Sequence, residues 1–296
     1  MKITVIIPCL YKHFKLINTV LDCHYNNSIK PNQIIISLNG CKKLNKNDID
    51  NLEKHYKSKF EDFFILRSKN KLNRAKARNV CFDYIKNDIV CFSDADDKEH
   101  SQRFEIIKYF FEKKKIDHLI HSYILEKCNK NLCNNCFLCK NKYNKTFINY
   151  KKIEQIDFCD SKKIFSINYP NKNIKPNVKN ILAINKNKKQ IMPVHGLVCV
   201  KKHVLEKIKF NENYPRGQDS LFSHEVLYKF KNSIVIDAQL HIYTNGWIPE
   251  KESFKKIELE KGEIYVNFGS PNPPYPGKPQ SQCEINSIIE SIKKNY

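Results

Sequence analysis

The chain has 296 residues and is 41% hydrophobic, which is enough apolar sequence to bury a large core and excludes a disordered polypeptide. Its 52 lysines and arginines outnumber 31 acidic residues, and the formal net charge of +21 favours phosphorylated ligands, nucleic acid or an anionic membrane surface. The charge also has a plainer explanation, because abundant lysine and asparagine with only 7 glycines is the composition that an AT-rich coding sequence produces. The basic runs are scattered, so we do not take the charge as a sign of nucleic-acid binding.

No stretch approaches the roughly 18 apolar residues that a membrane-spanning helix needs. The first apolar run, residues 3–7, passes directly into Pro8 and is typical of a structural strand, not of a cleavable signal. We therefore expect a soluble, cytoplasmic protein, for which any contact with a membrane would be peripheral. In that reducing compartment the 12 cysteines are expected to be thiols unless some of them bind metal.

Apolar runs and helical stripes alternate along the first 125 residues. The runs rich in β-branched residues, which are typical of strands, lie at residues 3–7, 34–36, 63–66, 89–92 and 118–125. The stripes typical of amphipathic helices lie at residues 14–21, 48–56, 77–84 and 102–113. This order predicts an α/β fold with a mostly parallel, twisted sheet and helices on both faces.

The pattern breaks after residue 125. Residues 126–190 are rich in cysteine, asparagine and lysine with weak periodicity, and we expect an insertion or a lid there. Order returns over residues 191–245, where the expected strands are at 196–200 and 234–243 and the expected helices are at 204–208 and 219–230. Residues 246–296 should form an extended C-terminal tail, because the prolines between 271 and 279 exclude a helix or a central strand.

Three carboxylates follow the apolar run at residues 89–92 within four positions: Asp94, Asp96 and Asp97. If that run is a buried strand, its end brings the acids to the carboxyl edge of the sheet, where open α/β sheets bind ligands. Like charges this close repel one another unless a hard cation neutralises them, and Mg²⁺ or Mn²⁺ takes carboxylate oxygens together with substrate phosphates. The pattern indicates a metal and a phosphate-bearing substrate; a solvated acidic turn is the alternative.

Three blocks of the sequence, in order, resemble glycosyltransferase family 2 with its GT-A fold. They are Ile3-Thr-Val-Ile-Ile-Pro8, Ala77-Arg78-Asn79 followed by Asp94-Ala-Asp-Asp97, and Gly217-Gln218-Asp219. The resemblance covers about residues 1–245. It implies a nucleotide-sugar-binding half over residues 1–125 and an acceptor-binding half over residues 191–245.

The resemblance also implies roles for individual residues. Asp96 would be the main ligand of Mn²⁺ or Mg²⁺, with Asp94 on the metal or the ribose and Asp97 supporting or facing the donor sugar. The residues around the nucleotide would be Pro8, Tyr11, Asn39 and Arg78. Asp219 would be the catalytic base that takes the proton of the acceptor hydroxyl as this attacks the anomeric carbon with inversion. A plain helix cap is the other common use of an aspartate at such a position.

The chain departs from the family at two positions. Where the family has acidic residues that hold the nucleotide base, this chain has Asn39, whose amide both donates and accepts hydrogen bonds. Gln218 stands where the family commonly has glutamate, which removes one charge beside Asp219. The resemblance implies a hexosyltransferase with a UDP-sugar as the expected donor and a hydroxyl of a glycan, lipid or protein as the acceptor.

Four cysteines gather in the insertion: Cys128, Cys133, Cys136 and Cys139. Thiolates this close either bind structural Zn²⁺ or remain free thiols, and their spacing matches neither paired zinc knuckles nor a plant-type iron–sulfur loop. His195, Gly196 and Trp247 are candidates for acceptor binding, although Trp247 could equally anchor the tail. His241, on a strand-like run, is either a core histidine with satisfied hydrogen bonds or a metal ligand.

Two other functions remain open from the sequence. A sugar-phosphate nucleotidylyltransferase also uses an α/β sheet and Mg²⁺, but it needs a glycine-rich loop where this chain has Pro8-Cys9-Leu10-Tyr11. A basic nucleic-acid-binding protein with a zinc module would explain the charge, but it leaves Asp219 and the three clustered aspartates without a role. We therefore expect a metal-dependent glycosyltransferase without a nucleic-acid partner.

Overall fold

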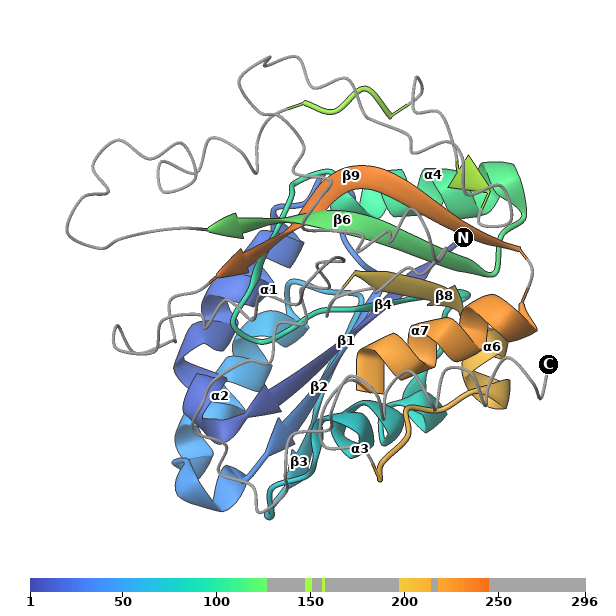
Figure 1. Cartoon of the computed structure of the whole chain (residues 1–296). Coiled ribbons are helices and arrows are strands. Elements are labelled where there is room, and N and C mark those ends of the chain that lie inside the picture. The colour runs from blue at the N-terminus through green and yellow to red at the C-terminus, as the bar shows by residue number, and fades with distance from the viewer. Residues whose placement is uncertain (127–146, 151–155, 158–196, 214–217, 231, 245–296) are drawn as a thin grey trace, which may run out of the picture.

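The computed structural model describes residues 1–126, 147–150, 156–157, 197–213, 218–230 and 232–244. Within these residues one sheet of nine strands has the order β3-β2-β1-β4-β8-β6-β9-β5, with β7 paired to β9 (Figure 1). The expected C-terminal tail and most of the expected insertion fall outside the described residues. Among the helices that the structure describes, none combines the length and apolar character needed to cross a membrane.

The strands are β1 (Ile3–Leu10), β2 (Gln33–Asn39), β3 (Asp62–Ser68), β4 (Ile89–Phe92), β5 (Lys98–Glu99), β6 (His118–Glu126), β7 (Ile156–Asp157), β8 (Val198–Lys201) and β9 (Ser233–Thr244). The α-helices are α1 (Ile17–Tyr25), α2 (Lys46–Lys57), α3 (Arg74–Asn79), α4 (Arg103–Lys114), α6 (Lys202–Lys207) and α7 (Gln218–Lys229). The 3-10 helices are η1 (Tyr11–Leu16), η2 (Cys41–Lys43) and η3 (Phe82–Tyr84). Each of these predicted strands and helices has a counterpart within the described residues. The two-residue strands β5 and β7 and the three-residue helix η2 were not predicted, because they are too short to show a periodicity.

The half of the sheet that contains β1 to β4 is parallel. β1 pairs in parallel with β2 and β4, and β2 pairs in parallel with β3. The other half is mixed, since β8 is antiparallel to β4 and β6, while β9 is parallel to β6 and antiparallel to β5 and β7. Neighbouring parallel strands need a crossover connection, which is usually a helix. The parallel half therefore coincides with the part of the chain in which strands and helices alternate regularly.

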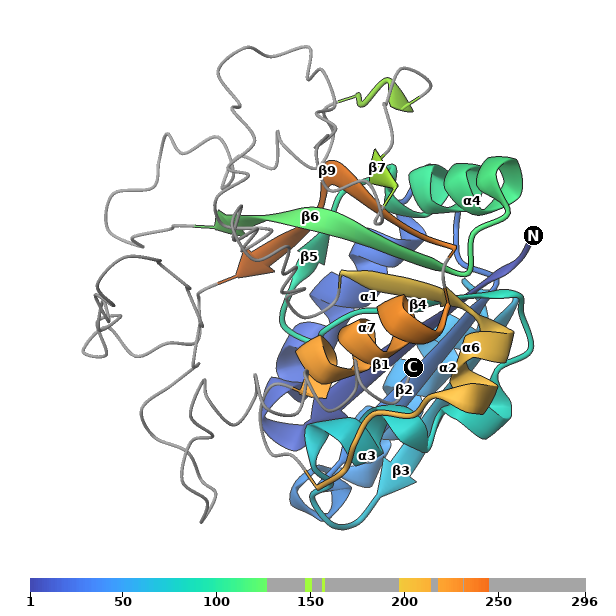
Figure 2. The same cartoon turned by 45° about the vertical axis from the view of Figure 1, so that its right-hand side comes forward.

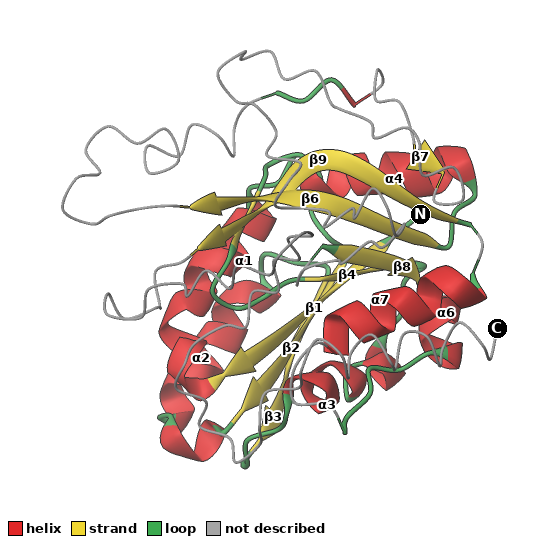
Figure 3. Ribbon diagram, viewed as in Figure 1, coloured by secondary structure: helices red, strands yellow, loops and turns green. Residues whose placement is uncertain are grey.

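Side chains alternate between two cores on opposite faces of the sheet. Val5 and Ile7 of β1 pack in the core that includes residues of α1, α2 and α4, whereas Ile6 packs in the core that includes residues of α3, α6 and α7. Figure 3 shows the helices on both faces, and Figure 2 shows α4 and β7 close to β9. The predicted arrangement of helices on both faces of an α/β sheet is confirmed.

β1 continues past the predicted turn at Pro8 and ends at Leu10. The β4 ladder stops at the pair of Ile6 and Phe92, and β2 continues to pair with β1 as far as Leu10. Pro8 therefore lies beyond the β4 pairing, where its missing N–H removes no hydrogen bond to that neighbour. As a result, β1 carries Tyr11 to the same edge of the sheet as the end of β2.

We expect Phe222→Ala to lower the free energy of unfolding by about 3–5 kcal/mol, because the ring is buried and its loss leaves a cavity. The ring stacks on Phe210 with centroids 4.2 Å apart, and Phe92 lies edge-on at 6.1 Å. The control is Phe147→Ala, whose side chain is 65% exposed and whose loss should change stability by about 0.5 kcal/mol or less. Urea denaturation followed by circular dichroism measures both variants, and equal midpoints would contradict the packing described.

Candidate active site

The three clustered aspartates lie at the carboxyl edge of the parallel strands. β4 ends at Phe92, and the segment that carries Asp94, Asp96 and Asp97 leads directly into β5. We call residues 94–97 the acidic turn. β1, which pairs with β4, and β2, which pairs with the other side of β1, end at this same edge of the sheet.

Arg78 joins the acidic turn to α7. Its Nη2 donates to Oδ1 of Asp94 at 3.1 Å, and its Nη1 lies 3.3 Å from Oδ1 of Asp219 in the first turn of α7. Arg78 and Asp219 are buried, so water screens their attraction little. The guanidinium also lies 5.3 Å from the centre of the Phe210 ring. Two carboxylates that are distant in the sequence are thus contacts of one side chain.

The electrostatics of the acidic turn centre on Asp96. Burial, together with the negative charges of Asp97 and Asp94, raises the pKa of Asp96 to about 7. Nδ1 of His13 lies 3.6 Å from Oδ2 of Asp96, and burial together with neighbouring basic residues lowers the pKa of His13 to about 4. The imidazole is therefore neutral at pH 7 and does not offset the negative charge. A bound cation would relieve the repulsion among these carboxylates.

The donor set of the acidic turn fits a metal that is shared with a substrate. The side chains of Asp94 and Asp96 are 20% and 27% exposed, so both remain accessible. In the described part of the chain, no group of three or more His, Cys, Asp or Glu side chains is arranged to hold a metal ion alone. Because Mg²⁺ in nucleotide sites commonly takes one or two carboxylates together with phosphate oxygens, these two carboxylates are sufficient in the presence of a diphosphate.

A buried charge network, made of Asp97, Glu99, Arg103 and His241, adjoins the acidic turn. Nε2 of His241 lies 2.8 Å from Oδ2 of Asp97, its Nδ1 lies 3.2 Å from Oε2 of Glu99, and Arg103 pairs with Oε1 of Glu99 at 3.0 Å. Burial alone would lower the pKa of His241, but Glu99 and Asp97 raise it to about 10. Burial alone would raise the pKa of Glu99, but Arg103 and His241 lower it to about 2. Burial and two hydrogen-bond partners match the first alternative expected for His241, a core histidine with satisfied hydrogen bonds, and its raised pKa favours the protonated ring.

Two other residues that were expected around the nucleotide lie near the ends of β1 and β2. Asn39 is buried, its amide nitrogen donates to the carbonyl of Ser37 at 2.8 Å, and among the described residues its Oδ1 has no hydrogen-bond partner. Tyr11 packs on Gly40, where a Cβ would lie 2.9 Å from the ring and where φ is +72°. The Nζ of Lys43 donates to the Tyr11 hydroxyl at 3.0 Å. Only glycine combines that backbone conformation with space for the ring.

The remaining sequence candidates lie outside the described residues. They are Cys128, Cys133, Cys136, Cys139, His195, Gly196 and Trp247. The described cysteines are free thiols, namely Cys9, Cys23, Cys41, Cys81, Cys91 and Cys199. Sequence reasoning missed His13, Glu99 and Arg103. Glu99 lies in β5 and Arg103 begins α4, so no helical spacing marked their ion pair, and nothing in the sequence marked His13 as a neighbour of Asp96.

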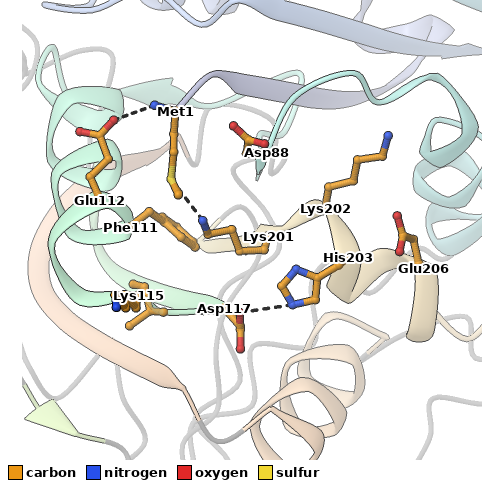
Figure 4. A pocket seen from close by; sticks show the side chains of 11 residues that line it. Met1, Asp88, Phe111, Glu112, Lys115, Asp117, Lys201, Lys202, His203 and Glu206 are labelled. Atoms are coloured by element: carbon orange, nitrogen blue, oxygen red, sulfur yellow. Dashed lines mark hydrogen bonds and ion pairs between the residues drawn. The ribbon is translucent and has the colours of Figure 1, made fainter.

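A surface cavity of about 490 Å³ lies away from the acidic turn (Figure 4). It is lined by residues that precede β1 and β4 and by the junction of β8 with α6, which is the amino-terminal edge of the parallel strands. Polar groups in it contact one another, as His203 does Asp117 at 3.2 Å and the amine of Met1 does Glu112 at 2.7 Å (Figure 4). The cavity contains none of the residues of the acidic turn.

The family model described as Glycosyl transferase family 2 matches residues 4–168, which is more than half of the chain. The chain therefore belongs to glycosyltransferase family 2, a family of sugar-transferring enzymes, and the resemblance seen in the sequence is confirmed. No curated protein matches the chain.

Solved structures of similar fold include glycosyltransferases. Residues 1–349 of S. aureus TarS in complex with UDP share 15% identity with a TM-score of 0.56, and the match covers 82% of this chain and 60% of that chain. The complex of TarS with UDP-GlcNAc shares 16% identity with a TM-score of 0.55, covering 82% and 58%. The mannosyltransferase PcManGT from Pyrobaculum calidifontis, in complex with GDP-Man and Mn²⁺, shares 13% identity with a TM-score of 0.51, covering 84% and 58%. The chain spans about three fifths of the length of these structures, and the likeness confirms the GT-A fold.

We expect Arg78→Lys to lower the free energy of unfolding by roughly 3 kcal/mol, because one ammonium group cannot contact both carboxylates and leaves a buried charge without its partner. The matched control is Arg67→Lys. Arg67 also bridges two acids, Asp50 and Glu53, each at 2.6 Å, but its side chain is 31% exposed, so the expected loss is below about 1 kcal/mol. Chemical denaturation measures both values, and equal losses would mean that burial does not strengthen the Arg78 bridge.

Proposed function

We propose that this chain transfers a hexose from a nucleotide-diphosphate donor to a hydroxyl acceptor, with inversion at the anomeric carbon and with the help of Mn²⁺ or Mg²⁺. The observation that carries the proposal is the position of Arg78, which contacts Asp94 in the acidic turn and Asp219 at the start of α7. Asp94 of the acidic turn and the proposed base Asp219 are therefore contacts of the same guanidinium. Membership of a family of sugar-transferring enzymes and the GT-A fold support the reaction class.

The carboxyl edge supplies groups suited to binding the donor. Asp94 and Asp96 would hold the metal together with the diphosphate, and the metal would offset negative charge on the departing nucleotide. Arg78 lies beside Asp94 and adds a fixed positive charge close to the same position. Because Arg78 is already buried and oriented before the donor binds, little reorganisation is needed at the moment of transfer.

Asp219 is the proposed base. It would accept the proton of the acceptor hydroxyl while that oxygen forms a bond to the anomeric carbon, and the bond from this carbon to the phosphate oxygen would break with its electron pair leaving on the diphosphate. Attack from the face opposite the leaving group inverts the configuration. Both the first turn of α7 and the guanidinium of Arg78 favour a negative charge on Asp219, as a base requires.

Asn39 supports a donor whose base presents a ring N–H group. The amide nitrogen of Asn39 is already bonded to Ser37, so Oδ1 is the group left to accept a hydrogen bond. Uracil offers such an N–H, and guanine does as well, whereas the corresponding ring nitrogen of cytosine is an acceptor. We propose a UDP-sugar as the donor, in line with the UDP and UDP-GlcNAc held by TarS.

The acceptor remains a hydroxyl compound in this proposal, either a glycan, a lipid or a protein, with His195, Gly196 and Trp247 as proposed contacts outside the described residues. The nucleotidylyltransferase alternative gains no support, because β1 passes directly into η1 with no glycine between them.

We expect Asp96→Ala to weaken Mn²⁺-dependent UDP binding by about 10-fold or more, since it removes a proposed metal ligand. Asp219→Asn should leave UDP binding within about 2-fold and reduce transfer by at least about 10²-fold, because it removes only the proposed base. Isothermal titration with UDP and Mn²⁺ measures binding, and release of UDP from a panel of UDP-sugars with glycan acceptors measures turnover.

The matched control is Asp48→Asn, since Asp48 also lies in the first turn of a helix, α2, but is exposed and outside the site. It should retain wild-type binding and turnover. Full activity in Asp219→Asn, or unchanged UDP binding in Asp96→Ala, would refute the respective assignments.

The base preference has its own test. Asn39→Asp keeps an acceptor oxygen and should bind UDP within about 3-fold of the wild type, whereas Asn39→Leu has no acceptor and should lose about 10-fold or more in UDP affinity. CDP, whose ring nitrogen donates no hydrogen bond, should bind weakly to all three proteins. If UDP and CDP bind the wild type equally well, Asn39 does not select the base.

A further inference from the structure

The buried charge network reaches both ends of the acidic turn. From α4, Arg103 donates through Nη2 to the carbonyl of Phe92, where β4 ends, at 2.9 Å, and through Nη1 to Oγ of Ser93 at 3.1 Å. The same Nη1 lies 3.0 Å from Glu99 in β5, and Nε lies 3.1 Å from Nε2 of His121 in β6. One guanidinium therefore contacts the chain immediately before the acidic turn and immediately after it.

His241 secures the turn from a different strand. It lies opposite Glu99 in the pairing of β5 with β9, and its two ring nitrogens contact Glu99 and Asp97. These residues and Arg103 are each between 0% and 3% exposed. The contacts thus run from Asp97 to His241, from His241 to Glu99 and from Glu99 to Arg103, and Asp97 is the member that belongs to the acidic turn.

Stability alone does not account for such a network, because apolar side chains of similar volume often stabilise a core as well as buried ion pairs do. Directional contacts instead fix the orientation of the groups that make them. Here they hold Asp97, the carbonyl of Phe92 before the acidic turn and the side chain of Glu99 after it, while Asp94 and Asp96 keep accessible carboxylates.

We propose that His241, Glu99 and Arg103 are positioning residues that hold the acidic turn in the geometry that binds a divalent cation and a diphosphate. The inference rests on the proposed function, since it assumes that the turn binds both. The three residues act through Asp97 and the neighbouring backbone. Loss of a residue that supports metal ligands typically weakens metal affinity by about 10- to 100-fold.

The test compares His241→Gln with His118→Gln. His118 is an equally buried histidine in β6, and its contact is with Oγ of Ser233, outside the network. Binding of Mn²⁺ in the presence of saturating UDP is followed through the electron paramagnetic resonance signal of free Mn²⁺. Thermal unfolding of each protein is measured in parallel. We expect His241→Gln to raise the Mn²⁺ dissociation constant about 10-fold or more, and His118→Gln to leave it unchanged even where the unfolding temperature falls.

Arg103→Lys is the second variant, since lysine keeps the charge but cannot reach the contacts of the guanidinium together. It provides the same measurement if His241→Gln does not fold, and it should weaken Mn²⁺ binding in the same way. Mn²⁺ affinity equal to the wild type in the folded network variants, or an equal loss in His118→Gln, would overturn the inference while the proposed function stands. Absence of Mn²⁺-dependent UDP binding in the wild type would overturn the proposed function, and the inference with it.

Discussion

The guanidinium of Arg78 is the interaction on which the candidate site depends. It is buried between Asp94, at the end of the parallel half of the sheet, and Asp219, at the start of α7. Without it, two carboxylates would lie near one another in a region that water screens little, and their repulsion would favour separation of α7 from the sheet edge. Arg78 belongs to α3. Ala75 of the same helix packs in the core that also contains Phe222 of α7. The packing of α3 and α7 in that core therefore also places Arg78 of α3 beside the proposed base Asp219 of α7.

Charge is distributed differently on the two sides of the acidic turn. On the inner side, in the buried charge network, His241 contacts both Asp97 and Glu99, and Arg103 pairs with Glu99. On the outer side, Asp96 has a raised pKa because burial and the neighbouring aspartates disfavour its ionised form. A divalent cation that binds together with a diphosphate substrate would supply the positive charge that the carboxylates of the outer side lack. The acidic turn is therefore anchored through Asp97, while Asp94 and Asp96 stay accessible to a charged ligand.

Much of the parallel half of the sheet could be predicted from the sequence, because its strands and helices are marked by patterns of neighbouring residues. The run at β4 is short, apolar and followed at once by acids, so both the strand and the chemistry at its end could be recognised. The end of β1 was harder, since Pro8 normally marks the end of a central strand, and only the early end of the β4 ladder permits the strand to continue. β5 could not be predicted, because a strand of two residues exists only through its pairing with β9.

The sequence by itself determined the α/β class, the order of strands and helices, and the presence of closely spaced aspartates at a strand end, since period and composition are properties of neighbouring residues. The tertiary structure alone decided that Arg78 contacts both Asp94 and Asp219, and that His241 lies in a buried network whose carboxylates raise its pKa. Those facts depend on which strands and helices lie side by side. A side chain acquires its partners, its burial and hence its pKa only from the groups that the fold brings around it.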